Sequence, residues 1–199
     1  SVIKITDNGK GIPKDEIRTA FMRHATSKID SFEDLENVLT LGFRGEALSS
    51  IASVAQVEML TRTENDSMGT RIVINGGVVD REEECAANVG TVFYVKNIFF
   101  NTPARRKFLK KPATEGSYIS EIVNRIALGH PNIAIKYVNN GNIVLQTNGD
   151  GNVKNSLFYI YGKDIASKML SLESEKDGYI LKGLVGKPEL SRGNRNYEN

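Results

Sequence analysis

The feature that most constrains the fold of this chain is a glycine-spaced acidic turn directly after a short strand pattern. Residues 2–6 alternate as a β-strand does, and residues 7–11 read Asp-Asn-Gly-Lys-Gly, a run of turn formers that ends the strand. Gly9 and Gly11 can adopt torsions that other residues avoid and let a ligand approach the backbone closely. Asp7, at the strand end, can accept a hydrogen bond from an exocyclic amine. The same residues also suit an ordinary strand-to-helix turn.

A second glycine-bearing segment, residues 41–48, precedes an amphipathic helix pattern. It reads Leu-Gly-Phe-Arg-Gly-Glu-Ala-Leu. The free N–H groups and the dipole at the start of such a helix form an anion site, and Arg44 could add positive charge to it. A loop that needs only flexibility before a helix would look the same. The helix is predicted to bury one stripe, because apolar residues recur at i, i+3, i+4 and i+7: Leu48, Ile51, Ala52 and Ala55.

Thr91 opens a third segment, a strand that begins after Gly90. Its hydroxyl could reach the same ligand as Asp7, although most strand threonines are structural. The chain has no Gly-x-x-x-x-Gly-Lys-Ser/Thr run, which excludes a P-loop protein. The two histidines are too few and too far apart to indicate a zinc site. We therefore predict no metal ligands in this chain.

The remaining patterns predict an α+β chain in two parts. Residues 148–152 are rich in turn formers and are the best linker candidate. We expect one domain over residues 1–150 and the beginning of a second over 151–199, with a long polar connection at 25–41. Helices are expected over 13–23, just after Pro103, and over 115–128 and 153–161. Strands are expected over 57–63, 70–74, 78–82, 91–96, 133–138, 143–147 and 179–185.

The charge balance does not mark a dedicated nucleic-acid binder. Lysine and arginine number 26 against 24 acidic residues, a formal net charge of +2, mixed rather than massed. A basic cluster at residues 105–111 suits either a solvated turn or a DNA-facing patch. The single cysteine excludes a disulfide framework and favours a reducing cytosol. No segment suits a bilayer span, and both ends look like cuts in a longer chain.

Three segments together resemble the MutL branch of the Bergerat, or GHKL, ATP-binding fold, which also serves DNA gyrase, heat-shock chaperones and histidine kinases. They are residues 23–29, Arg-His-Ala-Thr-Ser-Lys-Ile; residues 42–51, Gly-Phe-Arg-Gly-Glu-Ala-Leu-Ser-Ser-Ile; and residues 97–109, Asn-Ile-Phe-Phe-Asn-Thr-Pro-Ala-Arg-Arg-Lys-Phe-Leu. The other branches lack the third. The likeness runs from Val2 to about Val185. It implies a two-layer α/β sandwich followed by the start of a small, ribosomal-protein-like transducer domain.

The resemblance also implies a site for ATP and Mg²⁺. Asp7 would bind the adenine amino group with help from Thr91, and Gly9 and Gly11 would give close approach to the nucleotide. The lid would contribute Ala25, Thr26, Ser27 and Lys28, and the phosphate loop would contribute Leu41, Gly42, Phe43, Arg44, Gly45, Glu46, Ala47 and Leu48. In the family, the glutamate that activates water precedes this sequence and a catalytic lysine follows it. We therefore expect no catalytic residue here and little ATP hydrolysis by these residues alone.

The function that the resemblance implies is that of a slow DNA mismatch repair ATPase in the cytoplasm, associated with the nucleoid. ATP would order the lid and join two N-terminal regions of a homodimer into a clamp. The clamp would link mismatch recognition by MutS to strand incision by downstream repair proteins, with weak, non-specific DNA contact and no membrane. One alternative is another GHKL ATPase, such as a type II topoisomerase subunit, against which residues 101–105 argue. A second is a non-catalytic DNA-binding or scaffold module, against which the intact glycines argue.

Overall fold

The fold comes from a computed structural model, which describes residues 1–23 and 45–191. The chain divides into two compact units, residues 1–109 and 110–199, and each is described by itself. The domain boundary that we predict between residues 150 and 151 stays a prediction. The polar connection predicted at 25–41 lies outside the described residues.

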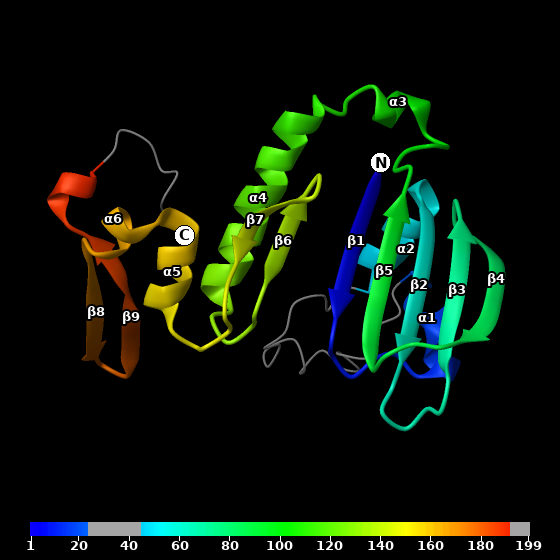
Figure 1. Cartoon of the computed structure of the whole chain (residues 1–199), viewed down its shortest axis with the longest axis horizontal. Helices are drawn as coiled ribbons and strands as arrows, with labels where there is room; N and C mark the ends of the chain where they lie inside the picture. The colour runs from blue at the N-terminus through cyan, green and yellow to red at the C-terminus, as the bar shows by residue number, and fades with distance from the viewer. Residues whose placement is uncertain (24–44, 192–199) are drawn as a thin grey trace. The chain divides into compact units, whose positions relative to one another are not determined.

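The first unit is built on a five-stranded sheet with the order β1-β5-β2-β3-β4 (Figure 1). All four strand pairs in it are antiparallel. Each predicted strand of this unit is present, with its ends moved by a few residues at most. The strands are β1 (Val2–Asp7), β2 (Gln56–Arg62), β3 (Gly69–Asn75), β4 (Val78–Cys85) and β5 (Gly90–Lys96).

Helices cover one face of this sheet, as the predicted two-layer sandwich requires. Side chains along β2 alternate between buried and half-buried, so the strand offers one apolar face. Residues from helices and strands meet there in a core of Ile17, Ala52, Ala55, Val57, Met59, Ile72 and Ile74. The helices of this layer are the 3-10 helix η1 (Lys14–Glu16), α1 (Ile17–Ala20) and α2 (Ala47–Val54). Figure 1 shows α1 and α2 behind the sheet.

Two predictions about these helices are wrong in detail. The helix predicted over 13–23 is confined to η1 and α1, and the chain leaves it at Phe21, whose ring packs against Phe93 with centroids 6.1 Å apart. Ile51, which we expected in the buried stripe, is 37% exposed. Ala52 and Ala55 bring α2 close to the sheet because they are small, and this leaves the larger Ile51 at the edge of the contact.

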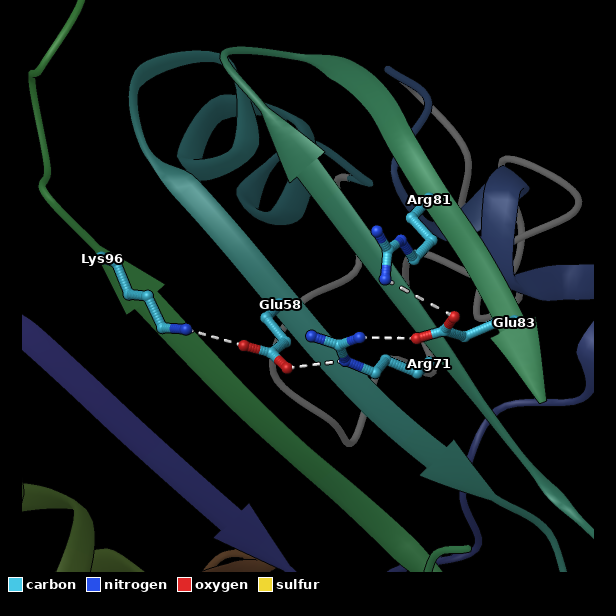
Figure 2. A network of polar contacts seen from close by, with 5 residues as sticks. All are labelled: Glu58, Arg71, Arg81, Glu83 and Lys96. Carbon is cyan, nitrogen blue, oxygen red and sulfur yellow. Dashed lines mark hydrogen bonds and ion pairs between the residues drawn. The ribbon is translucent and has the colours of Figure 1, made fainter. Parts of the chain in front are cut away.

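The opposite face of the sheet carries a network of charged side chains, shown in Figure 2. Glu58 accepts hydrogen bonds from Lys96 Nζ and Arg71 Nε, each at 2.7 Å. Arg71 also donates to Glu83 at 2.5 Å, and Arg81 lies 3.8 Å from the same carboxylate. The bonds from Lys96 and Arg71 lower the pKa of the Glu58 carboxyl. The network links four neighbouring strands, from β5 to β4, across their exposed face.

The second unit combines helices with two β-hairpins. Helix α5 spans the predicted 153–161, and α4 ends before His130 as predicted. The predicted turn at 139–142 joins β6 to β7, whereas β8, the partner of β9, has no counterpart among our predictions. The elements are α4 (Pro112–Gly129), β6 (Lys136–Asn139), β7 (Asn142–Gln146), α5 (Val153–Tyr161), α6 (Lys163–Ala166), β8 (Met169–Lys176), β9 (Tyr179–Gly186) and the 3-10 helix η3 (Pro188–Leu190).

The buried residues of the second unit are few. Ala127, Leu145 and Leu157 form its apolar interior, where α5 contacts both α4 and β7. Three isoleucines that share one face of α4, by contrast, are 38–58% exposed: Ile119, Ile122 and Ile126. Among the described residues, no helix is long and apolar enough to cross a membrane.

Candidate functional site

Asp7 ends β1, and its side chain shapes the turn that follows. Its Oδ1 accepts a hydrogen bond from the Gly9 backbone N–H at 2.9 Å. A β-carbon at position 9 would lie 2.9 Å from that same oxygen, so glycine leaves room for the carboxylate. The bond uses one carboxylate oxygen, and Oδ2 keeps its capacity to accept from a ligand. Asp7 is exposed and therefore open to such a partner.

Thr91 lies beside Asp7, as its predicted contact with the same ligand would require. The two residues are cross-strand partners in the β1–β5 pair, and cross-strand partners point to the same side of a sheet. Thr91 is 7% exposed. Its hydroxyl therefore lies on the face that the Asp7 side chain occupies, largely shielded from solvent.

Thr61 belongs to the same cluster, and sequence analysis missed it. It lies opposite Thr91 in β2 and is 1% exposed. Its Oγ1 accepts from the Ile12 N–H at 2.9 Å and lies 3.1 Å from Thr91 Oγ1 and 3.2 Å from the Gly90 carbonyl. With one proton, Thr61 can donate to only one of those two oxygens. The signal that could have found it is the β2 alternation, which puts Thr61 on the buried face.

Two glycines let separate segments close around this cluster. Gly11 has φ +73° and Gly90 has φ +113°, both in the region that disfavours side chains. A β-carbon on Gly11 would overlap the Arg62 carbonyl, and one on Gly90 would overlap the Asp7 carbonyl. Close packing of the turn on β2 therefore requires glycine at position 11, and the predicted approach of a ligand to Gly11 stays a prediction.

The predicted phosphate loop is described from Gly45 onward. Gly45 has φ +61°, and α2 begins two residues later with Glu46 at the N-cap position. The side chain of Glu46 makes no cap hydrogen bond to the helix. The first N–H groups of any α-helix lack partners within the helix. Ala47 and Leu48 lie in this first turn and present such groups.

Both groups of predicted residues share one face of the sheet. Asp7, Thr91 and Thr61 follow one another across three strands in register, and Thr61 is on the same side of β2 as Met59, which packs in the core with Ala52 of α2. Asp7 therefore lies on the face that α2 covers. The other predicted ligand-binding residues lie outside the described part of the chain: Ala25, Thr26, Ser27, Lys28, Leu41, Gly42, Phe43 and Arg44.

The loop beside the site is held by hydrogen bonds from Arg62 and Thr63. Arg62 donates to the Ala87 carbonyl at 2.7 Å and to the Asp66 carbonyl at 3.0 Å. Thr63 donates to the Asp66 carboxylate through its hydroxyl and its N–H, and these bonds lower the pKa of Asp66. Within residues 1–23 and 45–191, no group of three or more His, Cys, Asp or Glu side chains could hold a metal ion.

Comparison with known proteins finds MutL proteins that match almost the whole chain. The chain is 52% identical over 199 residues to the DNA mismatch repair protein MutL of Agathobacter rectalis, covering 100% of this chain and 31% of that protein. It is 50% identical over 195 residues to MutL of Lactobacillus delbrueckii subsp. bulgaricus, covering 98% and 30%. For Clostridium botulinum MutL the identity is 48% over 196 residues, covering 98% and 29%. The chain thus spans 29–31% of the length of these relatives.

Solved structures share the predicted fold. The Aquifex aeolicus MutL ATPase domain complexed with ADP superposes with a TM-score of 0.73 at 26% identity, covering 97% of this chain and 66% of that chain. The N-terminal domain of a DNA repair protein superposes with a TM-score of 0.72 at 24% identity, covering 98% and 63%. No family model matches the chain. The identity with MutL proteins nevertheless extends from one end of the chain to the other, and the chain belongs to the MutL family, in the region of its ATPase domain.

Proposed function

We propose that this chain forms the nucleotide-binding part of a DNA mismatch repair ATPase. The observation that carries the proposal is the cluster at the end of β1, where an exposed carboxylate, Asp7, adjoins the buried hydroxyl pair of Thr61 and Thr91. A carboxylate beside shielded hydroxyls suits recognition of an amino-substituted base. The similar MutL ATPase domain from Aquifex aeolicus is complexed with ADP, which agrees with this ligand class.

In this proposal Asp7 accepts a hydrogen bond from the adenine amino group. Thr91 helps through its hydroxyl, whose orientation Thr61 controls. Gly9 and Gly11 have no side chains, so that the nucleotide can lie close to the backbone of the turn. The residues proposed around the phosphates are Ala25, Thr26, Ser27, Lys28, Leu41, Gly42, Phe43, Arg44, Gly45, Glu46, Ala47 and Leu48.

The phosphate-binding step relies on the start of α2. Its unpaired N–H groups and the positive end of its dipole favour an anion. Mg²⁺ would neutralise phosphate charge when bound. The described residues include no group of three or more His, Cys, Asp or Glu side chains that could hold it. That these 199 residues hydrolyse little ATP stays a prediction, which magnesium-dependent turnover by this polypeptide would contradict.

The product of such an enzyme is a conformational state. A triphosphate that contacts the lid only in its ordered state shifts the protein toward that state. We propose that ordering joins two copies into a clamp that responds to MutS and directs downstream repair proteins, in the cytoplasm at the nucleoid. Weak, non-specific contact with DNA phosphates is proposed for the clamp as a whole. The relatives at 48–52% identity are named MutL, which favours this function over that of a topoisomerase subunit or a scaffold.

The test is the melting temperature of the full-length protein with and without Mg²⁺ and a non-hydrolysable ATP analogue. A ligand at about a hundred times its Kd should stabilise the protein by about 2.7 kcal/mol. Asp7→Asn should abolish the shift. The asparagine oxygen can still accept from the Gly9 N–H, but its NH₂ group would then face the adenine amino group, and two donors form no hydrogen bond. Asp15→Asn, an exposed acid in η1, should keep the shift. An unchanged melting temperature for the wild type would instead favour a fold kept for scaffolding.

A further inference from the structure

The C-terminal end of α2 is held by donors from two other parts of the first unit. The Asn101 side-chain Nδ2 donates to the Ser53 carbonyl at 2.9 Å. The Phe99 N–H donates to the Val54 carbonyl at 2.6 Å, and the Gly76 N–H donates to the Ala55 carbonyl at 3.1 Å. The last carbonyls of a helix have no partner within the helix. Here three successive carbonyls are bonded from outside it.

The segment that supplies two of these donors, residues 97–102, is itself tightly shaped. Asn97 and Phe99 have φ values of 50° and 63°, a region that a bulky aromatic residue adopts only when its surroundings impose it. Asn97 Nδ2 also donates to Gln56 Oε1 at 2.8 Å, just beyond the end of α2. The Phe100 and Thr102 N–H groups close turns within the segment. The positive φ angles of Asn97 and Phe99 thus occur in the segment that donates hydrogen bonds to the end of α2.

The third donor comes from the turn between β3 and β4, which also accommodates the Asn101 amide. Gly76 has φ +60°, and a β-carbon there would lie 3.0 Å from Asn101 Nδ2 and 3.4 Å from the Phe100 ring. The contact with Asn101 Nδ2 is tight enough that an added β-carbon would push this amide aside by a few tenths of an ångström. The β3–β4 turn, residues 97–102 and the end of α2 therefore pack together; we call this group of contacts the α2 anchor.

The α2 anchor holds the C-terminal end of the helix, and the proposed phosphate-binding turn lies at the other end. The helix has eight residues and is about 12 Å long, at 1.5 Å per residue. A helix this short tilts as a rigid body, because its hydrogen-bonded turns leave no flexible point between the ends. A shift at Ser53 would therefore redirect the N–H groups at Ala47 and Leu48. Those groups must converge on one anion to bind it well.

We propose that Asn101 is a positioning residue for the nucleotide site. It acts through α2, and it touches no nucleotide itself. Its amide fixes the helix end so that the first-turn N–H groups aim at the phosphates. This inference rests on the proposed function, since it requires that the start of α2 binds phosphate. It also gives a structural role to residues 97–102, which belong to one of the segments that carry the family resemblance.

The test measures the Kd of the full-length protein for a non-hydrolysable ATP analogue and for adenosine, which has no phosphates. Asn101→Ala should weaken binding of the triphosphate analogue about tenfold, which corresponds to about 1.4 kcal/mol. Binding of adenosine should stay within about twofold of wild type. Asn101→Asp should weaken binding of the triphosphate analogue more, because a carboxylate would face a carbonyl at the negative end of the helix dipole. Glu58→Gln, on the opposite face of the sheet, is the control: it should lower the melting temperature and leave both affinities unchanged.

Equal triphosphate affinity in wild type and Asn101→Ala would overturn the inference, as would equal losses for the two ligands, which would indicate general loosening. Asn101→Ser, with a shorter donor, decides the matter in the same way if the alanine variant does not fold. A wild-type protein that binds neither ligand would overturn the proposed function, and with it this inference. The wild-type measurement thus separates the two failures.

Discussion

At the scale of single residues, two glycines allow the site to form because they lack a side chain. Gly11 lies against the Arg62 carbonyl and Gly90 lies against the Asp7 carbonyl. Each brings the backbone of one segment onto that of another, so that the Thr61 hydroxyl can accept from the Ile12 N–H. Other residues are excluded at both positions for two separate reasons: the positive φ angle is unfavourable for a side chain, and a β-carbon would overlap a backbone carbonyl.

We predict that Gly11→Ala destabilises the protein by at least about 2 kcal/mol, measured by urea unfolding. The variant combines an unfavourable torsion with overlap of the new β-carbon and a backbone carbonyl that cannot easily move. Gly77→Ala separates the two effects, because Gly77 also has positive φ but its β-carbon would meet only Ser53 Cα at 3.7 Å, an ordinary contact. It should cost about 1 kcal/mol. Equal losses for both variants would mean that the packing contact contributes nothing.

A second residue-scale prediction concerns Glu58 and pH. Its pKa is lowered from the usual 4.5 by hydrogen bonds from Lys96 and Arg71. Because the folded pKa lies below the unfolded one, the stability that Glu58 adds is present above about pH 4.5 and is lost as pH falls through the folded pKa. Glu58→Gln should therefore cost about 1 kcal/mol near pH 7, and the difference from wild type should shrink below about pH 4.5.

Urea unfolding of wild type and Glu58→Gln between about pH 7 and about pH 3 provides this measurement. Glu64→Gln, an exposed glutamate of the same unit, is the control and should follow the wild-type curve closely. A Glu58→Gln deficit that stays constant through the acidic range would show that packing, rather than the charge, makes the difference.

At the scale of elements, α5 begins with a cap that local sequence can supply. Asn152 Oδ1 accepts from the Lys154 N–H at 2.9 Å. Asp150 in turn accepts from the Asn152 N–H at 2.9 Å and from the Asn155 side chain at 2.7 Å, and these bonds lower its pKa. Since every partner lies within five residues, this helix start depends on few distant contacts. That locality explains why the predicted range of α5 matches the observed one.

Asn152→Ala should accordingly destabilise α5 by about 1 kcal/mol, the usual cost of losing a helix cap. Hydrogen exchange of the α5 amides would measure it, with faster exchange expected from residue 154 onward. Lys154→Ala is the matched control, because its backbone N–H still donates to the cap while its side chain is lost. If both variants exchange alike, the Asn152 side chain is not the cap that stabilises this helix.

At the scale of the whole molecule, buried contacts are concentrated in the first unit. Its core joins α1 and α2 to the central strands β2 and β3. In the second unit, the side chains of β8 and β9 are exposed or half-buried along their whole length. A two-stranded hairpin without a buried face is marginal in water. The two parts of the molecule should therefore differ in local stability.

Native-state hydrogen exchange on a polypeptide of these 199 residues tests that difference. Amides of β2 and β3 should be the slowest to exchange, and those of residues 169–186 should exchange at least about a hundredfold faster, which corresponds to a gap of about 2.7 kcal/mol in opening free energy. Glu58→Gln should speed exchange in the first unit and leave residues 169–186 unchanged. Similar protection in both regions would contradict the uneven distribution of stability.

Features whose signals lie in neighbouring residues can be predicted from the amino-acid sequence. Turn formers mark the end of β1 and the β6–β7 hairpin, the range predicted for a helix at 153–161 matches α5, and residues 97–109 carry the family resemblance. Only the tertiary structure showed that Thr61 joins Ile12 to Thr91, that α2 is held at its end by Asn101, and that β8 pairs with β9. The physical reason is range: a turn or a cap is decided by neighbours in the chain, whereas the Thr61–Ile12 and Asn101–Ser53 bonds join residues 49 and 48 positions apart and exist only once the sheet register brings them together.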